Sequence, residues 1–251
     1  MAIITYDSIA GKAIFSNRLW DMKHPCLRAL AVAALVCLLS GCERSLSSDF
    51  ICRLPADEAT KLASPEFAAG YFPPSYAENG FACGKSCKPI IGAFESEWYP
   101  AVWKTASEGS LYQLSQRPIS GLDYTLRFTW LRSFHRPVII LVERKGKTFT
   151  MIAKELAGQG ENEWGRVQRT LERPLAAISA RQFQTVLDSK GLFDQPPATC
   201  EIGLDGSEWI FEIADRNGYR MVKRWSPRDG TAHDVGMFLL SQTGWQFGEI
   251  Y

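Results

Sequence analysis

Few residues of this 251-residue chain have the type and spacing that catalysis requires. The chain has three histidines, and two of them, His135 and His233, lie in its C-terminal half. A histidine titrates near neutral pH, so either one could act as a general acid or base. Neither belongs to a metal-ligand or nucleophile motif such as His-Glu-x-x-His or Gly-x-Ser-x-Gly. The sequence therefore favours a protein without catalytic activity, and it predicts no catalytic residue, no metal and no cofactor.

Two acidic residues provide an alternative, in which the protein is a hydrolase. Glu95 and Glu97 lie two residues apart in the segment Phe-Glu-Ser-Glu-Trp. On a β-strand, residues at i and i+2 point to the same face. Two neighbouring carboxylates can serve as the acid and the nucleophile or base of glycoside hydrolysis. Under this alternative, the pair or His135 would belong to a site completed by residues distant in sequence.

A basic segment is a candidate binding surface. Between Arg117 and Glu155 the chain has eight lysines and arginines but three acidic residues. The solvated face of a sheet would explain this surplus, and so would attraction to an anionic partner. The binding candidates in this segment are Arg127, Arg132, His135 and Arg136. The whole chain has a formal net charge of +1, which gives no reason to expect nucleic acid as a partner.

The N-terminal region has the layout of an export signal. Lys23 and Arg28 provide positive charge, and the eleven residues Ala29–Leu39 are apolar. Such a run is too short for a permanent membrane-spanning helix. Residues 1–21 contain two acids and precede a second methionine, unlike a short basic leader. We therefore predict an upstream extension over residues 1–21 and a signal peptide over residues 22–41.

The end of this region, Leu39-Ser40-Gly41-Cys42, resembles the lipobox of bacterial lipoprotein precursors. The resemblance covers residues 22–42. It implies that the Cys42 thiol carries a diacylglyceryl group and that cleavage makes Cys42 the first mature residue. Each acyl chain would contribute roughly 0.8 kcal/mol per buried methylene, which would hold the protein on a lipid membrane. Glu43, in place of aspartate, implies the outer membrane of the bacterial envelope, with the domain facing the periplasm.

Export implies an oxidising compartment, where the cysteines of the mature chain would form disulfide bonds. The candidates are Cys52, Cys83, Cys87 and Cys200. Of the three possible pairings, we favour Cys83–Cys87, which closes a short loop, together with Cys52–Cys200. A second interpretation is copper or thiol handling by Cys83 and Cys87, which requires free thiols at both positions.

The hydrophobic pattern of the remaining chain predicts an α+β domain. Apolar and polar residues alternate from Leu122 to Trp130, which indicates a half-buried antiparallel strand. Further strands are expected over residues 138–143, 148–154, 166–171, 208–214 and 219–225. One helix is expected to end at Gly191 and another to begin at Thr231, whereas residues 70–92 are expected to be irregular. We expect an antiparallel sheet of about five or six strands with a few helices packed on one face.

The turn between the last two strands decides how their side chains pair. Arg216-Asn217-Gly218 suits a three-residue loop with glycine in the left-handed conformation. That loop would place Trp209 opposite Trp225. The strands are rich in aromatic residues, and we expect these to fill the core rather than form a sugar-binding surface.

Together these patterns predict a membrane-anchored envelope lipoprotein. Residues 42–54 would be a tether and residues 55–251 a single domain, beginning with a short helix over residues 55–63. Residues 203–212 and 219–227 resemble segments of uncharacterised proteobacterial proteins, and that resemblance implies no activity. The favoured function is a non-catalytic binding or structural module with an envelope protein as possible partner, for example an inhibitor or immunity protein. The alternatives are an envelope hydrolase and a copper- or thiol-handling protein.

Overall fold

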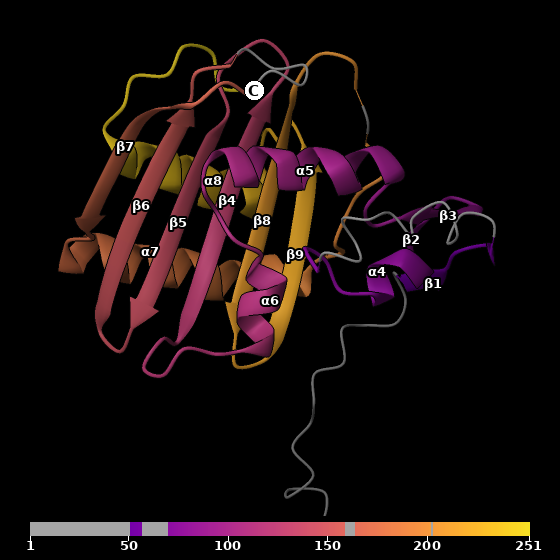
Figure 1. Cartoon of the computed structure of the whole chain (residues 1–251), viewed down its shortest axis with the longest axis horizontal. Helices are drawn as coiled ribbons and strands as arrows, with labels where there is room; N and C mark the ends of the chain where they lie inside the picture. The colour runs from indigo at the N-terminus through magenta and orange to yellow at the C-terminus, as the bar shows by residue number, and fades with distance from the viewer. Residues whose placement is uncertain (1–50, 57–69, 159–163, 202) are drawn as a thin grey trace, which may run out of the picture. The chain divides into compact units, whose positions relative to one another are not determined.

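A computed structural model describes residues 51–56, 70–158, 164–201 and 203–251 (Figure 1). The predicted extension, the signal peptide and Cys42 lie outside these residues, as does most of the helix expected over residues 55–63. Ile51–Arg53, at the end of the predicted tether, form strand β1 of the domain. In the part of the chain that is described, no helix combines the length and the apolar character needed to cross a membrane.

The larger of two sheets has six antiparallel strands in the order β7-β6-β5-β4-β8-β9 (Figure 1). The strands are β4 (Tyr124–Arg132), β5 (Val138–Lys145), β6 (Thr148–Leu156), β7 (Val167–Pro174), β8 (Ser207–Asp215) and β9 (Gly218–Trp225). The central strand, β4, pairs with β5 on one side and with β8 on the other. The predicted α+β class and strand number are therefore confirmed.

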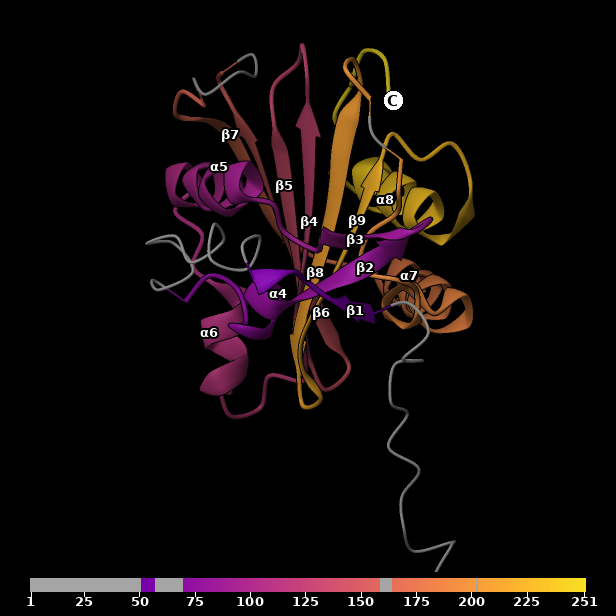
Figure 2. The ribbon, with the colours of Figure 1, turned by 90° about the vertical axis from the view of Figure 1, so that its right-hand side faces the viewer.

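Helices cover both faces of this sheet, whereas one covered face was expected. Figure 2 shows α7 (Ala177–Lys190) and α8 (Gly230–Thr243) on one side, and α5 (Ala93–Thr105) and α6 (Leu111–Gln116) on the other. As predicted, α7 ends at Gly191, which has a φ of 58°. Two buried clusters result, one for each face. All nine residues of β4 are consequently buried, so the expectation of a half-buried strand is wrong.

The aromatic residues of the strands divide between these layers. Phe128, Trp130, Trp209 and Phe211 are completely buried in the cluster beneath α7 and α8. They lie in the core, as expected, and present no surface on which a sugar could stack. Glycine at position 236 of α8 allows this packing, because a Cβ atom there would lie 2.2 Å from the Trp209 ring.

The turn between β8 and β9 is one residue shorter than expected. Asp215 pairs with Gly218, so the loop contains two residues, and Trp209 lies opposite Arg224 instead of Trp225. The Asp215 carboxylate accepts a hydrogen bond of 2.8 Å from the backbone N–H of Asn217, which stabilises the tight turn. The shift by one residue places the two tryptophans on opposite faces of the sheet.

A small second sheet lies within residues 51–89, a region expected to be tether and irregular structure. Its antiparallel strands are β1, β2 (Asn79–Cys83) and β3 (Ser86–Pro89), with the short helix α4 (Ser75–Glu78) before β2. The β2–β3 turn contains two residues, because Cys83 pairs with Ser86 and Ala82 with Cys87. Gly84 in this turn has a φ of 60°, a conformation that favours glycine.

All four candidate cysteines form disulfides, but the favoured pairing is wrong. The bonds are Cys52–Cys87 and Cys83–Cys200. Paired residues of an antiparallel ladder share a face, and successive residues alternate. Cys87 shares a face with Ala82, so it points away from Cys83 on the neighbouring position, and the expected Cys83–Cys87 bond would have to pass through the sheet. Cys52 pairs with Gly80 and therefore lies on the same face as Cys87.

The second disulfide connects the small sheet to the segment that leads into β8. Cys200 follows the 3-10 helix η2 (Leu192–Asp194), and its bond to Cys83 closes a sequence separation of 117 residues. The small sheet is therefore covalently linked to the six-stranded sheet through residues distant in sequence.

Candidate functional site

Arg127, one of the predicted binding residues, lies in the core. Its side chain is completely buried, with Nε 2.6 Å from Oε2 of Glu212 and Nη2 2.8 Å from Oε1. Nη1 donates a hydrogen bond of 2.8 Å to the carbonyl of Gly109, and the guanidinium lies 4.0 Å from the centroid of the Trp103 ring. These contacts connect the sheet to the layer that contains α5 and α6. Arg127 therefore has no exposed surface with which to contact a ligand.

The Glu95 and Glu97 carboxylates do not converge. Both residues lie on helix α5 instead of a strand, and residues at i and i+2 of a helix do not face each other. Glu95 Oε2 accepts a hydrogen bond of 2.7 Å from the backbone N–H of Gly92 at the start of the helix. Its Oε1 forms an ion pair with Lys223. Glu97 is exposed, so the two residues do not form a pair suited to glycoside hydrolysis.

A perturbed carboxyl group that the sequence did not reveal lies close to Glu95. Burial raises the pKa of Glu208 to about 7, and the charge of Glu95 acts in the same direction. Lys223 and Arg224 oppose this shift. Glu208 lies on β8, and it comes close to the Glu95 carboxylate because helix α5 packs on the sheet. The local sequence therefore gives no signal of the raised pKa of Glu208.

We expect Glu208→Gln to stabilise the protein above neutral pH. The pKa of Glu208 is about 7 when folded and 4.5 for an unperturbed glutamate, so the folded chain binds more protons between these pH values. The free energy of unfolding therefore decreases as pH rises from 4.5 to 7. The variant, which lacks this ionisation, should be more stable at pH 8 by up to roughly 3 kcal/mol.

Urea unfolding at pH 5 and pH 8 measures this difference. The matched control is Glu97→Gln, which removes an exposed carboxylate and should retain the pH dependence of the wild type. A Glu208→Gln protein with that same pH dependence would show that Glu208 does not titrate in this range.

The two histidines have separate surroundings. The ring of His233, on α8, stacks against Trp209 with centroids 6.1 Å apart, and its Nδ1 lies 3.5 Å from Oδ1 of Asp234. His135 Nδ1 lies 2.8 Å from the Tyr251 hydroxyl. Among the described residues, no group of three or more His, Cys, Asp or Glu side chains is placed to hold a metal ion.

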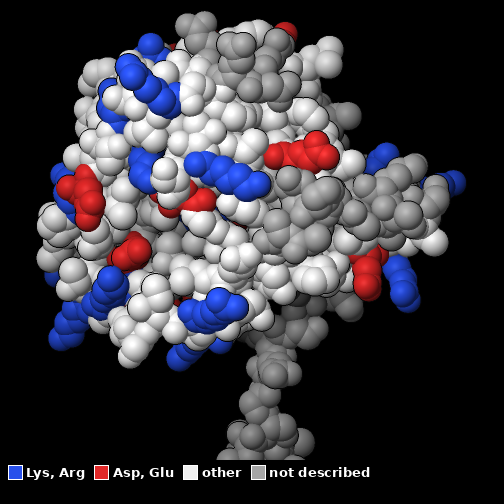
Figure 3. Space-filling model, viewed as in Figure 1, with Lys and Arg blue, Asp and Glu red and all other residues white. Residues whose placement is uncertain are grey.

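Most charges of the basic segment have a partner. Lys154 Nζ lies 2.5 Å from Oε1 of Glu108, and Arg144 Nε lies 3.6 Å from Oδ2 of Asp123. Lys145 lies 3.4 Å from Glu143. Figure 3 shows Lys and Arg side chains interspersed with Asp and Glu on the face that carries α5 and α6. The surplus seen in the sequence therefore does not produce an extended basic surface on that face.

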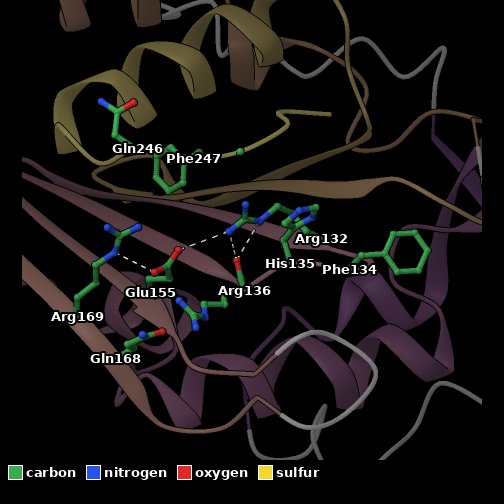
Figure 4. Close-up of a pocket in the computed structure, with 10 residues that line it drawn as sticks. Arg132, Phe134, His135, Arg136, Glu155, Gln168, Arg169, Gln246 and Phe247 are labelled. Atoms are coloured by element: carbon green, nitrogen blue, oxygen red, sulfur yellow. Dashed lines mark hydrogen bonds and ion pairs between the residues drawn. The ribbon is translucent and has the colours of Figure 1, made fainter.

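Three of the four predicted binding residues nevertheless meet in one pocket, which we call the arginine pocket (Figure 4). It has a volume of about 420 Å³ and lies where β4 ends, β5 begins and β6 leads into β7. The predicted residues in its wall are Arg132, His135 and Arg136. The other lining residues are Phe134, Glu155, Gln168, Arg169, Gln246, Phe247 and Gly248.

Arg132 forms the floor of the arginine pocket and is held in place on several sides. It is 5% exposed, and its guanidinium lies 4.1 Å from the centroid of the Trp130 ring. Nε donates a hydrogen bond of 3.0 Å to the Arg136 carbonyl, to which Nη2 also donates. Burial lowers the pKa of Arg132 to about 10; Glu155 and Tyr251 oppose the shift, whereas Arg169 and Arg136 add to it.

The Glu155 carboxylate forms ion pairs with two of the three arginines. Glu155 Oε1 lies 3.6 Å from Nη2 of Arg132, and its Oε2 lies 2.9 Å from Nε of Arg169 (Figure 4). The Arg169 guanidinium stacks 4.1 Å from the centroid of the Trp245 ring. Arg136 is exposed, and its guanidinium has no ion pair with any described residue.

Arg132, His135 and Arg136, which the charge surplus indicated as binding candidates, lie at the end of β4 and on the β4–β5 connection. Arg169 and Phe247 escaped prediction, because they lie on β7 and after α8, at least 30 and 110 residues away from that connection. A scan against models of protein families and a search of curated proteins found no match for this chain.

Proposed function

We propose that this protein is a lipid-anchored binding module of the bacterial envelope, without catalytic activity of its own. The observation that carries the proposal is the arginine pocket, in which three predicted binding residues meet beside Arg169 and Glu155. Two disulfides are consistent with an exported protein in an oxidising compartment. The lipobox resemblance at Cys42 provides the anchor. The partner would present negative charge to the pocket, as a protein inhibited or neutralised by this one could do.

The two alternative functions have less support. A hydrolase would need converging catalytic groups, but Glu95 caps a helix and Glu97 is exposed. His135 does line the arginine pocket, where its Nδ1 lies 2.8 Å from the Tyr251 hydroxyl. Copper or thiol handling would need free thiols at Cys83 and Cys87, but each of these residues is bonded to a different cysteine. A binding module requires neither feature.

Anchoring is tested by Cys42→Ser in the full chain, expressed in a bacterium with an outer membrane. We expect the wild-type protein to fractionate with membranes and to begin at an acylated Cys42. The variant should remain uncleaved, because the lipobox cysteine is missing. Mass spectrometry of the N-terminal peptide measures both properties.

The matched control is Cys37→Ser, which alters another cysteine of the leader and should leave processing unchanged. An unmodified Cys42 within an uncut wild-type chain would refute the anchor. Binding is tested in the same membranes: after cross-linking and capture with an antibody to the chain, a partner retained by wild type should be lost with Arg136→Glu. Equal capture by both proteins would refute the pocket as the binding surface.

A further inference from the structure

The arginine pocket has more positive than negative charge. Three guanidinium groups line it, those of Arg132, Arg136 and Arg169, and Glu155 is the one carboxylate among the described lining residues. Among the described lining residues, two positive charges therefore remain when Glu155 has neutralised one. Arginine keeps its charge at any physiological pH, so this surplus is permanent.

The pocket also has more hydrogen-bond donors than acceptors. An arginine has five N–H groups, and those of Arg132 Nη1 have no acceptor among the described residues. The guanidinium of Arg136 likewise donates to no described residue, although the Arg136 carbonyl accepts from Arg132. The side-chain amides of Gln168 and Gln246 line the same space. A ligand with several acceptor oxygens would satisfy these donors.

Two of the guanidinium groups are already positioned for such a ligand. Arg132 lies between the Trp130 ring and the Arg136 carbonyl, and Arg169 is stacked on Trp245. Side chains held in this way lose little rotamer entropy when a ligand binds, which favours affinity. The planar fork of arginine N–H groups also matches the spacing of oxygens in a phosphate or carboxylate.

We propose that the arginine pocket binds a phosphate monoester. This inference rests on the proposed function, because it names the ligand chemistry of the same pocket. A phosphate monoester has a charge of about −1.5 to −2 at pH 7 and three terminal oxygens, so it matches both the charge surplus and the donors. A monocarboxylate would leave about one positive charge without compensation. The phosphate could belong to a soluble small molecule or to a lipid headgroup.

An aromatic ring, that of Phe247, lies beside the guanidinium groups of the pocket. The Phe247 ring centroid lies 5.8 Å from the guanidinium carbon of Arg132 and 5.9 Å from that of Arg169. The organic part of the ester would therefore pack against Phe247, and its burial would add to the affinity. Phenyl phosphate combines both features and is the probe we choose.

Isothermal titration of the full chain, purified in detergent at low ionic strength, tests the proposal with three probes. We expect phenyl phosphate to bind most tightly, inorganic phosphate more weakly, and benzoate at least tenfold more weakly than phenyl phosphate. Phosphatidic acid in mixed micelles should compete with phenyl phosphate if a lipid is the source, and phosphatidylcholine should not. Competition by glycerol phosphate without competition by phosphatidic acid would assign the soluble source.

The critical variant is Arg136→Ala, because this exposed side chain can be removed without disturbing the core. Loss of one charged contact should weaken phenyl phosphate binding by about tenfold or more. Arg181→Ala, which removes an exposed arginine of α7 outside the pocket, should bind as wild type does.

Three results would overturn the proposal: no saturable binding of phenyl phosphate, benzoate binding as tightly as phenyl phosphate, or equal affinities for Arg136→Ala and Arg181→Ala. Failure of the phosphate proposal can be distinguished from failure of the proposed function. Phosphate binding by a chain that lacks an acylated Cys42 would refute the anchor alone. An anchored chain whose partner capture depends on Arg136, but which binds no phosphate, would refute the ligand alone.

Discussion

Arg127→Met is expected to lower the free energy of unfolding by about 3–5 kcal/mol. The substitution leaves the Glu212 carboxylate completely buried without its bidentate partner. The Tyr219 hydroxyl, 2.9 Å from Glu212 Oε1, would remain as a donor, but a neutral donor cannot compensate a buried charge. The variant also loses the contact between the guanidinium and the Trp103 ring. Urea denaturation at pH 7 measures the loss.

The double variant Arg127→Met/Glu212→Leu separates the cost of the unpaired Glu212 carboxylate from the cost of the lost guanidinium contact with Trp103. If the loss arises from an unpaired charge, removing the carboxylate as well should recover most of it. The control is Arg144→Met, since Arg144 pairs with Asp123 at the surface, where both side chains are at least 36% exposed. That control should cost less than about 1 kcal/mol. A single Arg127→Met variant as stable as this control would contradict the structural role of the buried pair.

Removal of the Cys83–Cys200 disulfide, by Cys83→Ser/Cys200→Ser, is expected to cost about 2–5 kcal/mol. The bond closes a separation of 117 residues, against 35 for Cys52–Cys87, so its loss releases more entropy in the unfolded chain. It also detaches the small sheet from the segment before β8. Thermal unfolding should therefore show the small sheet separating from the main sheet, or a lower single midpoint.

Reduction provides the control for this prediction. Treatment with a reductant should lower the midpoint of the wild type at least as far as the double substitution does. Cys52→Ser/Cys87→Ser should have the smaller effect, because the bond it removes joins strands that already pair with β2. If both double variants unfold as the wild type does, neither bond contributes to stability.

The buried ion pair and the long-range disulfide both join segments that are distant in sequence. The Arg127–Glu212 pair joins β4 to β8 across 85 residues of sequence, and the Cys83–Cys200 disulfide joins the small sheet to the segment before β8 across 117 residues. Arg127 also contacts the α5–α6 layer through Gly109 and Trp103. The arginine pocket depends on such connections as well, because its wall is assembled from the β4–β5 connection, β7 and the residues after α8.

Local sequence patterns were sufficient to predict several features of this protein. Alternating apolar residues over Leu122–Trp130 predicted the strand that is β4, because a strand exposes successive side chains to opposite faces whatever its neighbours are. Gly191 predicted the end of α7, because glycine adopts the left-handed conformation at little cost. The binding candidates Arg132, His135 and Arg136 lie together in the arginine pocket because they are neighbours in sequence, at the end of β4 and just after it.

The remaining features depend on which segments pack together. Arg127 fits the polar side of an alternating strand, and its burial follows from a second layer of helices that covers this side. The cysteine pairing follows from strand register, since a shift of one residue reverses the face of every side chain. The addition of Arg169 and Phe247 to the pocket requires β7 and the chain after α8 to reach the end of β4. Contacts of this kind join segments that are far apart in sequence, so no local pattern reveals them. The folded arrangement determines them.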